Sequence, residues 1–119
     1  MQEFIFLIRS EGDCAEHMSA EQHSEHLQRV INYIDNLRTK GLFIGAQPLT
    51  MNGSILSSGK SGIKDGPFIE SKEVIAGYFL IRAHSLDAAI AIASEHPLLR
   101  DDESARIEVR EIKHQIGIN

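Results

Sequence analysis

The chain has 119 residues, of which 42% are hydrophobic and 24% are charged. This length and composition are typical of one globular domain over residues 1–119, and they exclude a disordered or fibrous chain. The 17 acidic residues outnumber the 12 basic ones, and the net charge of -5 argues against a nucleic-acid partner. The apolar runs are far shorter than the ~20 residues that span a bilayer, so we expect no membrane partner.

Cys14 is the only cysteine, so the chain cannot form an internal disulfide. No basic segment followed by an apolar one opens the sequence, and we therefore expect a reducing, cytoplasmic location. Cys14 also has no neighbouring base in the sequence, so we do not expect it to be a nucleophile.

The first elements are a strand and a long helix. Residues 4–8 form a β-branched and aromatic run that is apolar on both alternating faces, which predicts a buried strand. Residues 19–22 fit a capping box, and Gly41 is typical of a helix end, so we expect a helix over residues 20–40. Its apolar stripe consists of Leu27, Val30, Ile31, Ile34 and Leu37.

Strands also dominate the middle of the chain. Residues 42–50 predict a second strand, and Asn52-Gly53 is a dipeptide that favours tight hairpins because both positions tolerate positive φ. We therefore expect residues 54–57 to return beside the second strand. Residues 58–62 predict a flexible stretch, and Gly59-Lys60-Ser61 within it is no phosphate-binding loop because no helix follows.

The last third of the chain predicts a strand, a helix and another strand. Residues 77–82 are apolar on both faces, Ser85 is a helix cap, Pro97 ends that helix, and residues 106–112 alternate like a half-exposed strand. The order β-α-β-β-β-α-β is a ferredoxin-like α+β plan, with two helices on one face of a largely antiparallel sheet.

Two helices cover only one face of such a sheet. The strands at residues 4–8 and 78–81 are nevertheless apolar on both faces, so the second face also needs a cover. A second copy of the chain, packed sheet against sheet, is the simplest cover, and we expect a homodimer.

Residues 65–68 read Asp-Gly-Pro-Phe, and Glu-Ser-Lys-Glu at 70–73 and Gly-Tyr-Phe at 77–79 follow them. In this register the three segments resemble the signature of the DGPF branch of the YCII-related proteins, and the resemblance extends over about residues 3–113. It implies a dimeric ferredoxin-like α/β-barrel fold. It implies little about activity, because most members of the family have no assigned reaction.

The resemblance also implies a His–Asp pair, by analogy with muconolactone-isomerase-like folds and a dehydrochlorinase relative. The histidine of that pair lies early in the first helix, where this chain has His23 and His26. In the best-known YCII branch the aspartate precedes a proline after the second helix, and His96 stands at that position here. A carboxylate partner would then come from Asp65 or Glu70.

The histidines also allow an interpretation without catalysis. His23 and His26 lie one turn before the apolar stripe, so they can lean toward the sheet. There they would either carry a proton beside a carboxylate or form hydrogen bonds as boundary residues. Histidines three residues apart share a helix face, but zinc takes three or four ligands and no second cluster is present. We therefore expect no metal and no cofactor.

The segment after Asp65 has two interpretations as well. Residues 65–68 are either a rigid turn anchored in the core by Phe68 or the wall of a pocket. Glu70 and Lys72 are either solvated and weakly paired, or they place a general base and a ligand-orienting charge at that wall.

The leading interpretation is a small dimeric enzyme with a pocket between the first helix and the sheet. It would carry out acid–base chemistry, such as isomerisation or elimination, on a small polar or aromatic metabolite. His26 or His23 would carry the proton, with Asp65 or Glu70 as its partner. The ligand pocket would include Phe68, Lys72 and His96. The alternative is a non-catalytic ligand-binding or regulatory module, since proteins of this family occur beside sigma-factor-type regulators.

Overall fold

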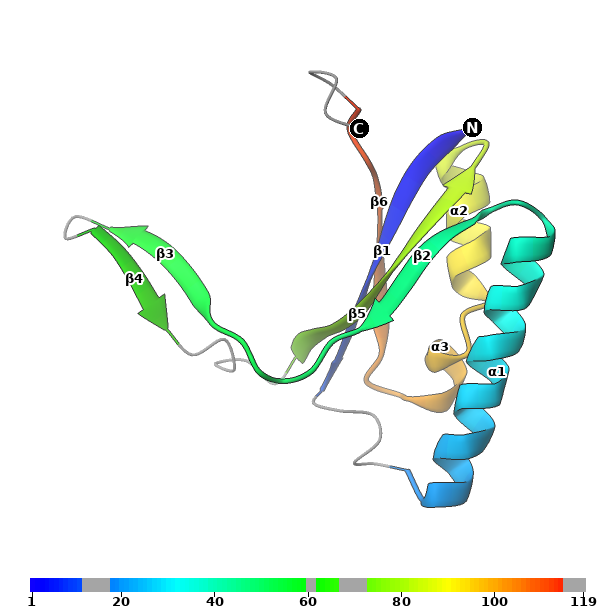
Figure 1. Cartoon of the computed structure of the whole chain (residues 1–119), viewed down its shortest axis with the longest axis horizontal. Coiled ribbons are helices and arrows are strands. Elements are labelled where there is room, and N and C mark those ends of the chain that lie inside the picture. Colours follow the sequence, from blue (N-terminus) through cyan, green and yellow to red (C-terminus); the bar gives the residue numbers. More distant parts are fainter. Residues whose placement is uncertain (12–17, 60–61, 67–72, 115–119) are drawn as a thin grey trace.

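The computed structural model describes residues 1–11, 18–59, 62–66 and 73–114. Figure 1 shows a twisted sheet with its helices on one side and a two-stranded arm that projects on the other side. The elements are β1 (Gln2–Glu11), α1 (Ala20–Thr39), β2 (Phe43–Pro48), β3 (Ile55–Gly59), β4 (Gly62–Gly66), β5 (Glu73–Ala83), α2 (Leu86–Ser94), α3 (Leu98–Asp101) and β6 (Arg106–Glu111).

The main sheet has four antiparallel strands in the order β2-β5-β1-β6. The first strand in the sequence, β1, therefore lies inside the sheet between β5 and β6. This is the strand order of the ferredoxin-like plan, and the α+β fold predicted from the sequence is confirmed. No helix within the described residues is both long and apolar enough to cross a membrane.

The hairpin predicted at Asn52-Gly53 is wrong. β2 pairs with β5, whereas β3 pairs with β4, with Gly59 opposite Gly62. Pairing with β5 lets Phe43 and Ala46 of β2 join the core, while every residue of β3 is exposed. The turn preference of Asn52-Gly53 is not realised because β3 pairs with β4 instead of with the outer edge of β2, and β3 and β4 form a separate arm (Figure 1).

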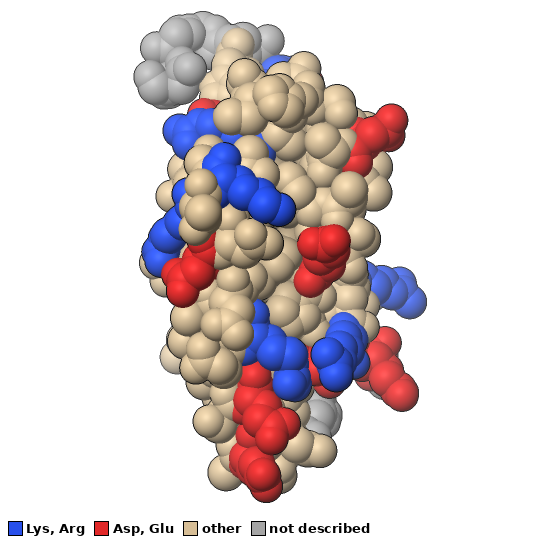
Figure 2. Space-filling model, turned by 90° about the vertical axis from the view of Figure 1, so that its right-hand side faces the viewer, with Lys and Arg blue, Asp and Glu red and all other residues tan. Residues whose placement is uncertain are grey.

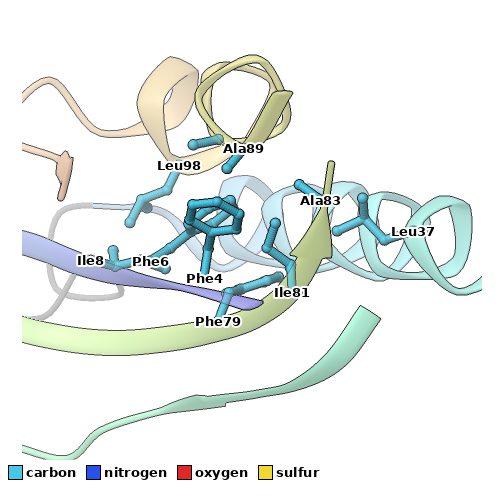
Figure 3. Close-up of a cluster of buried hydrophobic side chains, with 10 residues drawn as sticks. Phe4, Phe6, Ile8, Leu37, Phe79, Ile81, Ala83, Ala89 and Leu98 are labelled. Carbon is cyan, nitrogen blue, oxygen red and sulfur yellow. The ribbon is translucent and has the colours of Figure 1, made fainter. Parts of the chain in front are cut away.

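The core lies between the sheet and the helices, and side chains from β1 and β5 form its floor (Figure 3). Alternation along β1 points Phe4, Phe6 and Ile8 toward the helices, and α1, α2 and α3 all add side chains to this core. Phe4, Phe6 and Ile81 have no measurable exposed surface. This packing fixes the position of all three helices over the sheet.

The predicted helix over residues 20–40 is confirmed, with both of its ends capped. The Ser19 hydroxyl accepts from the backbone N–H of Gln22 at 3.1 Å, and the Ser19 N–H donates to the Gln22 side chain at 2.9 Å. Gly41 has φ of 72°, and backbone bonds from Gly41 to Arg38 and from Leu42 to Leu37 end α1 in a Schellman motif.

The buried stripe of α1 differs from the predicted one. Leu27 and Ile31 are 47% and 50% exposed, whereas His26 is only 6% exposed. The face that packs on the core carries Leu37, with Val30, Tyr33 and Ile34 partly buried beside it. His26 thus occupies the first position of the buried face, one turn before Val30.

α2 ends before Pro97, as predicted, but the chain turns at once into the short helix α3. Pro97 stands at the start of α3 with φ of -57°, where its missing N–H costs no helical hydrogen bond. Leu98 is buried in the core and anchors this turn. One turn later, the backbone N–H of Asp101 donates to the carbonyl of Pro97 at 3.0 Å, which sets Asp101 opposite α1.

Candidate functional site

A histidine–aspartate pair joins α1 to α3. Nδ1 of His26 lies 2.7 Å from Oδ2 of Asp101, and the two side chains are only 7% and 9% exposed. The residues are 75 positions apart in the chain, so the pair is formed by the tertiary fold alone. A buried hydrogen bond of this length between an imidazole and a carboxylate is charge-assisted.

Arg29 completes this group from the same helix face, three residues after His26. Its Nε donates to Oδ2 of Asp101 at 3.1 Å, and its Nη2 donates to Oδ1 at 3.0 Å. Both carboxylate oxygens are therefore engaged by a two-pronged guanidinium contact. The Arg29 side chain is 34% exposed, so its charge lies where the buried pair meets solvent.

The carboxyl of Asp101 is ionised at neutral pH. Burial by itself raises its pKa, but the hydrogen bonds from His26 and Arg29 and the positive charge of Arg29 outweigh burial and hold the pKa below its usual range. An ionised carboxylate only accepts hydrogen bonds, so the proton in the bond to His26 belongs to Nδ1.

His96 lies beside this group and is 4% exposed. Its ring meets Tyr33 and Phe79 edge-on, with centroid distances of 5.1 and 4.8 Å. Burial, and then the charge of His26, lower the pKa of His96 to about 4, so the ring is neutral at pH 7. The two histidines are therefore close enough for the charge of one to affect the pKa of the other.

Tyr33 forms part of the same wall. Its hydroxyl donates to the carbonyl of Ile92 at 2.6 Å, which ties α1 to α2. Burial, and then the negative charge of Glu95, raise the pKa of Tyr33, so its hydroxyl keeps its proton at neutral pH.

A pocket of about 680 Å³ opens between α1 and the segment from α2 to α3. It lies within the helical layer, whereas the sequence predicts a pocket between the first helix and the sheet. Figure 2 views the helical side of the molecule, where acidic and basic side chains are interspersed. The lining includes Arg29, Tyr33, Glu95, His96, Leu99 and Arg100.

The structure brings together only part of the predicted site. His96 lines the pocket, whereas His26 bonds Asp101 and is not among the lining residues, and His23 is half-buried on the first turn of α1. Asp65 belongs to β4 of the arm, where its backbone faces Leu56, on the side of the sheet away from the helices (Figure 1). Three further predicted site residues lie outside the described part of the chain: Phe68, Glu70 and Lys72.

Sequence reasoning missed Asp101 and Arg29. The sequence predicts Asp65 or Glu70 as the carboxylate partner of His26, whereas the structure shows that Asp101, five residues beyond His96, bonds it. Two signals point to it in retrospect. Arg29 lies three residues after His26, so the two side chains share one helix face. Pro97 is a favourable first residue for a new helical turn, and that turn ends at Asp101.

The described residues contain no group of three or more histidine, cysteine, aspartate or glutamate side chains that could hold a metal ion. Around His26, the carboxylate of Asp101 is already bound on both oxygens by the imidazole and the guanidinium.

Comparison with known proteins agrees with this fold. The YCII-related domain matches residues 4–113, and the chain belongs to this family. A similar solved structure is 5-chloro-2-hydroxyhydroquinone dehydrochlorinase from Burkholderia phenoliruptrix, in complex with 2,5-dihydroxybenzoquinone. The two chains share 16% identity over 94% of each, with a TM-score of 0.51, a likeness that shows the fold alone. No curated protein matches the chain significantly.

Replacement of Asp101 by Asn should destabilise the protein by about 2–3 kcal/mol at pH 7, because Arg29 and His26 lose a buried charged acceptor. The matched control is Asp35→Asn, which breaks an exposed pair with Arg38 and should cost less than about 0.5 kcal/mol. Urea unfolding measures both values.

The effect of Asp101→Asn should depend on pH. The pKa of Asp101 is lower in the folded chain than in the unfolded one, where it is about 3.9. The carboxylate therefore stabilises the fold fully above that pH, and this stabilisation is lost as the pH falls through the folded pKa. The measured quantity is the difference in free energy of unfolding between the wild type and Asp101→Asn. If this difference stayed constant from neutral pH into the acid range, the assigned ionisation of Asp101 would be contradicted.

Proposed function

We propose that this chain is a small enzyme that carries out acid–base chemistry, by isomerisation or elimination, on a small polar or aromatic metabolite. The observation that carries the proposal is the buried bond of 2.7 Å between Nδ1 of His26 and the Asp101 carboxylate. With the proton held on Nδ1, the neutral ring of His26 has its free electron pair on Nε2. That nitrogen is then a general base.

Asp101 and Arg29 act as positioning residues. The carboxylate fixes the tautomer and orientation of His26 and stabilises the imidazolium that forms when Nε2 takes a proton. The fork of Arg29 keeps the carboxylate ionised and holds it in place from α1. A base supported in this way contributes about 10²–10⁴-fold to a reaction limited by proton transfer.

The chemistry needs no change of oxidation state. Nε2 of His26 removes a proton from the substrate, and the electron pair left behind either expels a leaving group or takes up the proton again at another atom. The fold neighbour is named as a dehydrochlorinase of a hydroxylated, chlorinated ring, and its name supports elimination from a ring of this kind as the first reaction to test.

The test uses His26→Asn, because the Asn amide can still donate to Asp101 from the position of Nδ1 but offers no base at Nε2. Chloride release from 5-chloro-2-hydroxyhydroquinone and isomerisation of small unsaturated lactones are measured for the wild type and the variant. We expect a loss of kcat/KM of about 10²-fold or more in His26→Asn. His84→Asn, at an exposed histidine outside the site, serves as the control.

Full activity in a folded His26→Asn variant would refute the assignment of His26 as the base. Substrate binding to the wild type without any turnover would instead favour the alternative, a non-catalytic ligand-binding or regulatory module. The single cysteine supports a reducing, cytoplasmic setting for either function.

We further propose that the protein acts as a homodimer, with the open face of the sheet against a second copy. On β1, Ile5 and Leu7 alternate with the core residues, and their cross-strand partners on β5 are Leu80 and Tyr78. These four apolar side chains are only partly buried in the single chain, which supports an additional cover on this face.

Light scattering after size-exclusion chromatography tests this dimer. Leu80→Lys places a charge among the four apolar side chains and should shift the protein toward the monomer. The control Ile31→Lys changes an equally apolar residue that is 50% exposed on α1, and it should remain dimeric. A monomeric wild type, or a Leu80→Lys variant as dimeric as the wild type, would contradict the proposal.

A further inference from the structure

His96 is a neutral imidazole with a fixed proton. Its Nδ1 accepts a hydrogen bond from the backbone N–H of Leu98 at 3.1 Å, within a fully buried contact. A nitrogen that accepts carries the free electron pair, so the ring proton lies on Nε2. The low pKa of His96, about 4, keeps the ring in this form at neutral pH.

The Nε2–H group has no hydrogen-bond partner among the described residues, although the atom is buried. An unmade bond of this kind destabilises the fold, and buried donors in folded proteins are nearly always satisfied. The ring cannot turn to relieve this cost without losing the bond to Leu98. Tyr33 and Phe79 also hold the ring edge-on from two sides.

His96 is also part of the wall of the pocket between α1 and the α2–α3 segment. Two guanidinium groups line the same pocket. Arg29 uses its Nε and Nη2 on Asp101, and Arg100 is exposed and forms no salt bridge with the described residues. Leu99 and the Tyr33 ring supply apolar surface. The pocket therefore offers apolar surface and guanidinium donors for an oxygen anion, with Glu95 as the one carboxylate among its lining residues.

We propose that this pocket binds a small phenol or enolisable carbonyl compound, whose oxygen accepts a hydrogen bond from Nε2–H of His96. The ligand oxygen supplies the acceptor that the fold leaves out, and the guanidinium of Arg100 favours a negatively charged form of the ligand. Nε2 exposes no surface in this structure, so this bond requires a local movement of the pocket wall when the ligand enters.

This inference deepens the proposed function and rests on it for the reaction alone. His26 is not among the residues that line this pocket, so a substrate that bonds His96 must extend from the pocket toward His26. When Nε2 of His26 then takes a proton from the substrate, negative charge develops on the substrate oxygen. A neutral imidazole donor stabilises that oxygen without giving up its own proton. In this proposal His26 acts as the base, and His96 acts as the hydrogen-bond donor to the substrate oxygen.

Binding is tested without turnover, with 4-nitrophenolate as the probe and nitrobenzene as its partner of similar shape that lacks the oxygen anion. Two variants distinguish the role of Nδ1 of His96 from the role of Nε2. His96→Asn keeps an acceptor for Leu98 at the position of Nδ1 and removes the donor, whereas the amide of His96→Gln can donate from the position of Nε2. Circular dichroism and thermal melts confirm that each variant is folded.

The wild type should bind 4-nitrophenolate with a displaced absorption band, and nitrobenzene at least tenfold more weakly. His96→Asn should lose at least tenfold in affinity, and His96→Gln should recover most of that loss. Equal affinity of wild type and His96→Asn, or no binding of the phenolate by the wild type at millimolar concentration, overturns the inference.

The two proposals fail in different ways. If His26 is not the base, His26→Asn keeps its activity, but the binding of 4-nitrophenolate still depends on His96. If His96 is not the donor, its variants bind the phenolate like the wild type, and the loss of activity in His26→Asn is unaffected.

Discussion

The Asp101 carboxylate is the contact on which the site depends. It lies at the end of a helix of only four residues, and it meets an imidazole and a guanidinium from a 20-residue helix. A short helix of this kind has little stability of its own, so the charged bonds to α1 and the burial of Leu98 hold it in place. The same bonds orient His26. In the proposed function, the carboxylate of Asp101 therefore both supports the structure and positions the base.

The sheet contributes to the site by fixing the helices above it. Phe79 of β5 packs in the core and also meets the ring of His96, so the floor of the core is at the same time the support of the site. The opposite face of the sheet carries its own apolar residues and the β3–β4 arm, away from the helices (Figure 1). The molecule thus separates a helical side, which carries the His26–Asp101 pair, from the opposite side of the sheet, where we propose the contact with a second copy.

The fold was largely predictable from the sequence, since strand alternation, the capping box and Gly41 are local signals that tertiary packing preserved. The hairpin at Asn52-Gly53 was not, because β3 pairs with β4 and not with β2, and the residues around Asn52-Gly53 do not indicate that partner. The site was predictable only in part. His26 and His96 stand out in the sequence, but the bond to Asp101 spans 75 positions and depends on a turn that begins at Pro97, which local patterns indicate only as a helix stop.

The position of the ring proton of His26 tests the account most directly. Long-range proton–nitrogen NMR of the histidine rings, at a pH where the His26 ring is neutral, distinguishes a protonated from an unprotonated ring nitrogen. The account predicts a proton on Nδ1, bonded to Asp101, and an unprotonated Nε2 that is ready to act as the base. A neutral His26 ring with its proton on Nε2 would contradict both the ionised partner and the catalytic role.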